Sequence, residues 1–293
     1  MVTPTPDVPY RESFNDNDGQ WISGQLTDTI SSWLHTVSPD SRLSNTDGGL
    51  WITGQSMSSD MPAYRASEQS FVESPCIDLG LLDFPMLSFK YWMDTDQGDD
   101  GAVVQYKVGD GAWRLLGAIG LGDNWYNREN IIGTPGGSEA NERRIGWSGR
   151  DTTGLVARFG LDEVKQAIGD STVRFRIVFG SSRDLPSEHL FGFAFDDFTI
   201  NNRDRVVVVE HFTNSQQVPS LFSQDTALTN LLPNNQIVVD IRYHTSFPTT
   251  EPLITRQSNR ADISARALHY GVASLPHTVL DGSLPEPGFL PLI

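Results

Sequence analysis

Four segments in the first two hundred residues alternate apolar and polar positions with a period of two. Successive side chains of a β-strand point to opposite faces, so this alternation predicts strands with one buried face. Clusters of Gly, Asp and Ser separate the segments, as is typical of the turns of an antiparallel β-sandwich or jelly roll. The four predicted strands cover residues 87–94, 102–109, 173–180 and 191–200.

Two of these strands have strongly apolar faces. Segment 173–180 sets Arg174 and Arg176 opposite a face that carries only valine, isoleucine and phenylalanine. Residues 161–168 have the spacing of a short helix, and no other convincing helix precedes residue 204. The last strand is expected to bury three phenylalanines on one face: Phe191, Phe193 and Phe195.

Beyond residue 204 the pattern changes. Strand-like apolar runs alternate with stretches of helical spacing, and this β-α-β-α-β order predicts a smaller α/β unit. The predicted strands cover 206–212, 236–243 and 277–282, and the predicted helices cover 219–232 and 255–270.

Composition changes at the same place. All 7 tryptophans and all lysines of the chain precede residue 204. Because a length of 293 residues suits about two domains, we place the boundary there. We expect a flexible segment 1–9, a β-sandwich domain 10–203 and a smaller domain 204–293.

Charge and hydropathy narrow the range of partners. The formal net charge is −16, whereas phosphate binding needs a clustered positive surface, so we expect no nucleic-acid partner. No apolar run approaches the ~20 residues of a membrane-spanning helix, and no signal-peptide pattern opens the sequence. The oligomeric state stays open.

Several motifs in the first domain occur in an order that resembles a known family. They are RESFNDNDGQW, ASEQSFVESPCIDLG, LSFKYW, DGAVVQYKVGDGAWRLLG, DNWYN, GWSG, VRFRIVFGSS and GFAFDDFTI. Together they resemble the MAM-like, concanavalin-like jelly rolls of secreted and cell-surface proteins in Bacteroidetes. The resemblance implies a non-catalytic β-sandwich for adhesion, recognition or spacing, often with structural calcium.

Adjacent aspartates, Asp196 and Asp197, interrupt the last apolar strand. One of them must face inward, where an unpaired charge costs several kcal/mol, so we expect an ion or an arginine partner. Arg174 or Arg176 is one alternative. The family resemblance implies the other, a calcium ion held between the first and last strands. The candidate ligands are Glu12, Asp16, Asp196 and Asp197. The acidic turn DTDQGDDG does not fit an EF-hand loop and is expected to be a solvated turn.

Aromatic residues suggest a second kind of site. No E-x-D-x-x-E string of the concanavalin-like glucanases occurs, but an exposed aromatic pair could stack on sugars. Trp125 and Tyr126 in DNWYN are the best candidates for such a platform. Trp92 and Trp113 lie within or beside strands and are expected in the core.

The last ninety residues resemble the thioredoxin-like domains of Bacteroidetes outer-membrane and surface proteins, through VVVVEHFTN, DIRYHTSFP and ARALHYGVASLPHTVLDG. The resemblance implies a cis Pro276 beside a peptide-binding groove, although the remnant could instead pack on the sandwich. Ser215 to Val218 stand where such proteins place Cys-x-x-Cys, and a thiolate is needed for disulfide exchange. Cys76, the one cysteine, is expected to be a small buried hydrophobe. We expect a redox-inactive, incomplete domain.

The sequence therefore predicts a mainly β protein: an antiparallel β-sandwich (jelly roll) followed by a smaller, incomplete α/β thioredoxin-like domain. The expected function is non-catalytic binding, adhesion and scaffolding outside the cell or on its outer surface, with a protein or glycan partner. One alternative is a carbohydrate-binding accessory module of a secreted degradative enzyme. Another is an enzyme with perturbed carboxylates or histidines in a cleft.

Overall fold

The computed structural model describes most of the chain, in two compact units. The described residues are 1–37, 43–46, 48–54, 64–169, 172–184, 189–203, 207–216, 238–247, 249–250, 259–280 and 282. The first unit is Met1–Arg203 and the second is Asp204–Ile293. The division falls where the tryptophans and lysines of the sequence end.

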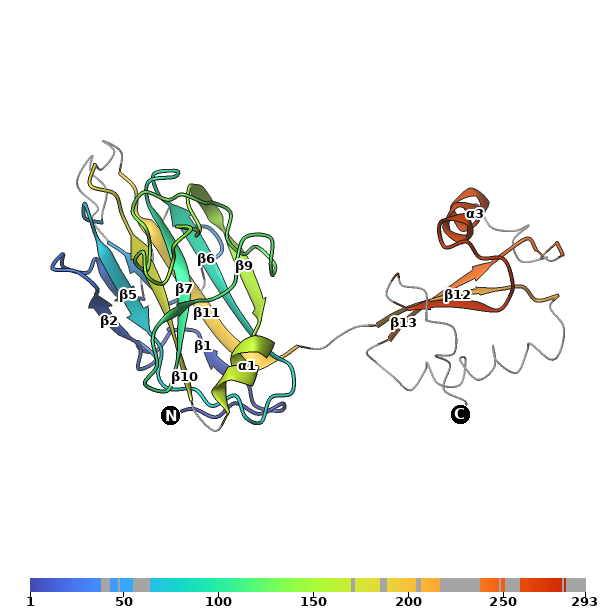
Figure 1. Ribbon diagram of the computed structural model, residues 1–293, viewed down its shortest axis with the longest axis horizontal. Coiled ribbons are helices and arrows are strands. Elements are labelled where there is room, and N and C mark those ends of the chain that lie inside the picture. Colours follow the sequence, from blue (N-terminus) through green and yellow to red (C-terminus); the bar gives the residue numbers. More distant parts are fainter. Residues whose placement is uncertain are drawn as a thin grey trace. The chain divides into compact units, whose positions relative to one another are not determined.

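The first unit is a sandwich of two antiparallel sheets (Figure 1). The six-stranded sheet has the order β3-β4-β11-β6-β9, with β1 also paired to β11. Its strands are β1 (Tyr10–Glu12), β3 (Trp33–Thr36), β4 (Leu50–Thr53), β6 (Pro85–Asp94), β9 (Arg150–Gly160) and β11 (Gly192–Asn202).

The second sheet of the sandwich has five strands in the order β2-β5-β10-β7-β8. They are β2 (Ile22–Gln25), β5 (Gln69–Glu73), β7 (Gly101–Val108), β8 (Arg114–Leu115) and β10 (Val173–Gly180). Helix α1 (Asp162–Ile168) follows β9 and packs Val164 and Ile168 against the core. The predicted mainly β class, the four long strands and the short helix are confirmed.

Aromatic side chains fill the space between the sheets. Phe175 of β10 and Phe198 of β11 are fully buried, and their ring centroids lie 6.2 Å apart across the sandwich. Phe89 of β6 stacks on Phe198 at 6.0 Å. Each such ring removed from water contributes about 1.5 to 3 kcal/mol, so this layer is the main source of stability of the unit.

A β-bulge interrupts β11. Between Asp196 and Thr199 the strand has one residue more than its partner β6, and Asp197 has a φ of 52°. The extra residue reverses which side chains point inward. The buried series therefore runs through Phe193 and Phe195 and then through Phe198.

Phe191 does not join this series, which corrects one prediction. It packs with Trp92, Leu50 and Ile52 in a separate cluster. Gly192, which follows it, has a φ of 89°, and a Cβ there would lie 2.1 Å from Thr53 Oγ1. Only glycine fits this turn, and the change of direction takes Phe191 out of the alternation of the strand.

The N-terminal segment contacts the sandwich at Val2. The Val2 amide donates to the Cys76 carbonyl at 2.8 Å, and the Val2 carbonyl accepts from the Asp78 amide at 2.9 Å. These bonds add a short bridge beside Ile77.

The second unit contains a three-stranded mixed sheet and a helix. Strand β12 (Val207–Thr213) lies between β13 (Val238–His244), which is parallel to it, and β14 (His277–Leu280), which is antiparallel. Helix α3 (Arg260–His269) precedes β14, and the Leu275–Pro276 peptide bond is cis. The three predicted strands and the second predicted helix are found within a few residues of their expected bounds. The predicted helix 219–232 lies outside the described residues.

Phe212, Tyr270 and Val279 form the small core of this unit together with Ala267 and Leu275. No helix in the described parts of either unit is long and apolar enough to cross a membrane.

Candidate functional site

Trp125 and Tyr126 lie in the core, so the predicted sugar-stacking platform is wrong. They are 6 % and 3 % exposed. Trp125 Nε1 donates to the Leu116 carbonyl at 3.2 Å, and the Tyr126 hydroxyl donates to the same carbonyl at 2.8 Å. Both polar groups thus find partners inside the protein, and the rings pack against Trp147. Buried aromatic residues normally satisfy their N–H or O–H in this way.

The prediction for Trp113 is wrong in the opposite direction. It was expected in the core but is half-buried, just before the edge strand β8. Its ring lies 4.0 Å from the Arg176 guanidinium carbon and 5.1 Å from Lys107 Nζ, measured to the ring centroid. Trp92, in contrast, is fully buried as predicted, and its Nε1 donates to the Ser44 carbonyl.

The four calcium candidates occupy two neighbouring strands and the loop that follows β1. Glu12 on β1 lies opposite Phe198, two positions from Asp196 on β11. The Asp196 side chain is 1 % exposed, whereas Asp16 and Asp197 are exposed. Glu12 Oε1 accepts from the Phe14 amide at 2.9 Å, and Asp196 Oδ1 accepts from the Asp197 amide at 2.6 Å.

Within the described residues, no group of three or more His, Cys, Asp or Glu side chains could hold a metal. A calcium ion there would need backbone carbonyls beside two carboxylates, Glu12 and Asp196, which is within its usual ligand range.

The arginine alternative for the aspartates is wrong. Arg174 and Arg176 belong to β10 of the other sheet. Arg174 Nη1 pairs with Glu73 at 2.8 Å, and its Nε contacts Cys76 Sγ at 2.9 Å. Cys76 is half-buried and hydrogen-bonded, which corrects its expected role as a plain buried hydrophobe.

The acidic turn after β6 is ordered by internal hydrogen bonds. Asp100 is fully buried; it accepts from the Tyr64 hydroxyl at 2.6 Å and from the Ser182 amide at 2.7 Å. Burial raises the pKa of this carboxyl above its ordinary value. Asp100 is therefore structural and is not a solvated turn residue.

A polar cavity of about 450 Å³ opens where β6 ends and β9 begins. The wall on the β6 side carries Thr95 and Gln97, and the wall on the β9 side carries Ser148 and Arg150. Met93 and Leu190 add apolar surface, and Asp96, Asn127 and Gly149 complete the lining. This polar cavity is lined mainly by hydrogen-bonding groups, unlike the mostly apolar pockets that bind drug-sized ligands.

The walls of the polar cavity are fixed by hydrogen bonds. Asn127 Oδ1 accepts from the Ser148 amide at 3.0 Å, and its Nδ2 donates to the Ser148 carbonyl at 3.1 Å. Thr95 Oγ1 accepts from the Gly149 amide at 2.8 Å. Arg150 Nε lies 3.1 Å from Asp94 Oδ1. Gln97, in contrast, is exposed. The cavity is thus pre-formed, with one side chain well placed to contact a ligand.

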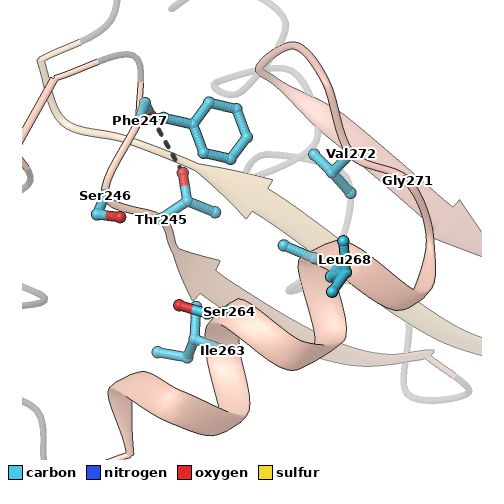
Figure 2. Close-up of a pocket in the computed structure, with 9 residues that line it drawn as sticks. Thr245, Ser246, Phe247, Ile263, Ser264, Leu268, Gly271 and Val272 are labelled. Carbon is cyan, nitrogen blue, oxygen red and sulfur yellow. Dashed lines mark hydrogen bonds between the residues drawn. The ribbon is translucent and has the colours of Figure 1, made fainter.

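In the second unit, a cavity of about 410 Å³ lies between α3 and the loop after β13. Figure 2 shows Phe247 and Val272 on one side of it and Ile263 and Leu268 of α3 on the other. Asn214 fixes the loop, because its Nδ2 donates to the carbonyls of Thr245 and Phe247 at 3.0 and 2.9 Å.

The predicted peptide-binding residue of this unit, Pro276, is half-buried and does not line that cavity. Ser215 and Gln216 are exposed after β12, and residues 217–218 lie outside the described parts.

No protein-family model matches the sequence, and no curated protein matches it either. Solved structures are similar to this chain at a low level. The K1 cleaved adhesin domain of Lys-gingipain from Porphyromonas gingivalis W83 is 14% identical with a TM-score of 0.37, and the match covers 67% of this chain and 98% of that chain.

Two carbohydrate-binding modules are similar at the same level. TmCBM61, solved with β-1,4-galactotriose, is 7% identical with a TM-score of 0.38, covering 66% of this chain and 95% of its own. The CBM22-2 xylan-binding domain of Paenibacillus barcinonensis Xyn10C is 11% identical with a TM-score of 0.32, covering 66% and 99%. Values this low transfer no function to this chain.

Proposed function

We propose that the sandwich unit is a non-catalytic binding module that holds a glycan in the polar cavity between the ends of β6 and β9. The observation that carries this proposal is a cavity of about 450 Å³ whose lining is polar and held rigid by internal hydrogen bonds. Sugar hydroxyls both donate and accept hydrogen bonds, so they match the side-chain amide of the exposed Gln97. A rigid site also reduces the entropy cost of binding.

The state of the lining side chains favours binding over catalysis. Ser148 Oγ accepts from the Gly98 amide at 2.8 Å, and Arg150 is paired with Asp94. A nucleophilic serine instead needs an adjacent base that accepts its proton. These side chains are occupied in shaping the cavity.

Binding of neutral oligosaccharides tests this function. Xylohexaose, cellohexaose and mannohexaose would be titrated calorimetrically into the full chain. We expect at least one to bind, and we expect Gln97→Ala to weaken it about tenfold, because a hydrogen-bonding side chain at the cavity is lost. The matched control is Gln25→Ala, which removes an exposed glutamine on β2. Equal affinities of the two variants would exclude the polar cavity as the site.

A secreted or outer-surface setting, with adhesion and scaffolding as the biological role, belongs to the same proposal and rests on the resemblance of the motifs. An accessory module of a secreted enzyme is the second candidate, because the same cavity would serve it. The two differ in what is joined to the chain, and purification of the native protein from culture medium with its partners distinguishes them.

Structural calcium is also part of this proposal. Its support is the placement of Glu12 and the buried Asp196 on paired strands β1 and β11. An ion held there would tie the first strand of the sandwich to the last.

For the second unit we propose a redox-inactive thioredoxin-like remnant. Its support is the strand order β13-β12-β14, with one parallel and one antiparallel pair, followed through α3. The backbone edge at Pro276 would accept an extended peptide by β-augmentation. Loss of peptide binding in Pro276→Ala, with the fold retained, is the expected result; unchanged binding would exclude this edge.

A further inference from the structure

A group of cations and aromatic rings lies on the face of the five-stranded sheet that points away from the sandwich core. We call it the cation–aromatic cluster: Phe71, Lys107, Trp113, Arg174 and Arg176. On β10, Arg174 and Arg176 alternate with Phe175 and Ile177, which are buried in the core. Lys107 of β7 lies directly opposite Arg174. Three positive side chains therefore share one face, in a chain whose formal net charge is −16.

Arg176 is the centre of the cluster. It is only 6 % exposed, and its Nε and Nη2 donate to Gln105 Oε1 at 2.9 and 2.7 Å. Gln105 is itself fixed, because its Nε2 donates to the Gly136 carbonyl at 2.9 Å. Gln105 is thus a positioning residue that holds the guanidinium in one orientation and leaves Nη1 unused.

Two aromatic rings flank this guanidinium. The Trp113 centroid lies 4.0 Å from its carbon, and the Phe71 centroid lies 5.0 Å from it. Phe71 is on β5, on one side of β10, and Trp113 precedes β8, on the other side beyond β7. Cation–π contacts of this kind stabilise a desolvated guanidinium and keep it flat between the rings.

The positive charge of the cluster is only partly compensated. Glu73 is the nearby carboxylate, and it pairs with Arg174. Within the described part of the chain, no carboxylate forms an ion pair with Arg176 or Lys107. Burial lowers the pKa of Arg176 to about 10, which reflects the cost of holding a cation away from water. A bound anion would offset this cost.

We propose that the cation–aromatic cluster is a second binding site, separate from the polar cavity, and that it takes a uronate-bearing oligosaccharide. A carboxylate would accept a charge-assisted hydrogen bond from Nη1 of Arg176, because Gln105 already holds Nε and Nη2. Lys107 adds a second charge. The sugar ring to which the carboxylate is attached packs its C–H face against aromatic carbon of Trp113. This ring contact favours an acidic sugar over an acidic peptide, whose carboxylate is carried on a flexible chain.

Calorimetric titration of trigalacturonate and its methyl ester into the full chain tests this proposal. The two probes differ in the charge of the carboxyl groups. We expect the acid to bind at least about tenfold more tightly than the ester, because charge-assisted hydrogen bonds are lost in the ester. Raising the salt concentration from 20 to 300 mM should weaken binding of the acid and leave binding of the ester unchanged. Equal affinities, or no binding of the acid, would overturn the proposal.

Variants locate the site. Arg176→Lys keeps the charge but loses the planar guanidinium. Lys107→Gln removes a half-buried charge without changing the core. Each substitution should weaken the binding of trigalacturonate about tenfold. The matched control is Arg114→Gln, because Arg114 is exposed and lies opposite Tyr106, on the other face of the sheet. Unfolding temperatures identify any variant that fails to fold. An equal loss in Arg114→Gln would show that only net charge matters and would contradict the site.

Two further measurements separate the outcomes. An aspartate-rich peptide that binds the cluster more tightly than trigalacturonate would assign it to a protein ligand and overturn the carbohydrate proposal. Neutral oligosaccharide binding, measured in parallel, tests the polar cavity alone. The two proposals therefore stand or fall independently.

Discussion

At the scale of single residues, two tryptophans of the sandwich differ in burial. Trp125 is enclosed by Trp147 and Phe159, with ring centroids 5.0 and 4.8 Å away, whereas Trp113 stays at the surface. A loop motif and a strand-flanking motif in the sequence suggested the reverse. The exposure of Trp113 could have been predicted from the alternation of side chains along the strands. This alternation places Trp113, like Lys107, on the same face of the sheet as the two arginines.

Replacing these tryptophans provides the first prediction. Trp125→Ala should lower the free energy of unfolding by about 3 to 5 kcal/mol, because it leaves a cavity in a packed core. Trp113→Ala should cost clearly less, since the Trp113 side chain is only partly buried. Urea unfolding of both variants measures the difference. Equal losses would contradict the placement of the two rings.

Glu210 on β12 is a buried carboxylate that binds helix α3. It accepts hydrogen bonds from Arg266 Nε at 2.7 Å, from the Tyr270 hydroxyl at 2.6 Å and from the Tyr243 hydroxyl at 3.0 Å. Arg266 is the main reason that the pKa of Glu210 falls from its ordinary 4.5 to about 2. The folded state thus binds the proton less tightly than the unfolded state does.

The sign of this pKa shift gives the second prediction. The contribution of Glu210 to stability is fully present above the unfolded pKa of 4.5 and is lost as the pH falls toward about 2. Glu210→Gln should be less stable than the wild type at pH 7, and the difference should shrink from pH 4.5 downward. NMR of the β12 amides during urea unfolding would follow this unit. A difference that does not change with pH would contradict the assignment.

At the scale of elements, the bulge in β11 places an acidic pair where the strand changes its neighbour. β4 pairs with β11 at Phe195, and β1 pairs with it from Phe198 onward. The bulge residues between these pairings include the buried Asp196. An ion at this junction would bridge β1 and β11 next to the point where the pairing with β4 ends.

Calcium dependence is the third prediction. Added calcium should raise the melting temperature of the full chain, and a concentration of 100 times the dissociation constant corresponds to about 2.7 kcal/mol. Glu12→Gln should abolish the increase, while Asp110→Asn, an exposed carboxylate in the turn after β7, should retain it. A melting temperature unaffected by calcium and by chelator would exclude the site.

At the scale of the whole molecule, the sequence alone excludes one activity of the second unit, because residues 215–218 contain no cysteine. The fourth prediction follows: the full chain should not accelerate insulin reduction above a Cys76→Ser variant, because no dithiol is available. Reduction well above that control would contradict the proposed redox-inactive remnant.

Much of the fold could be predicted from the sequence, because period-two alternation and helical spacing are local properties. Segment 173–180 coincides with β10, and the inward direction of Phe175 and Ile177 follows from parity alone. The position of Phe191 could not be predicted, because it depends on the backbone at Gly192.

The polar cavity also could not be predicted from the sequence. It joins Gln97 to Ser148, which are brought together only when β6 pairs with β9. The cation–aromatic cluster likewise depends on the register between β7 and β10. Such sites arise from long-range pairing, which local patterns do not specify.

The central claim is that the sandwich binds a glycan in the polar cavity, and amide chemical-shift mapping tests it most directly. The full chain, labelled with ¹⁵N, would be titrated with the tightest-binding neutral oligosaccharide from the calorimetric panel. The proposal predicts that the largest shifts occur at Thr95, Gln97, Ser148 and Gly149, around the cavity walls. Saturable shifts confined to other surfaces, with these four amides unchanged, would contradict it.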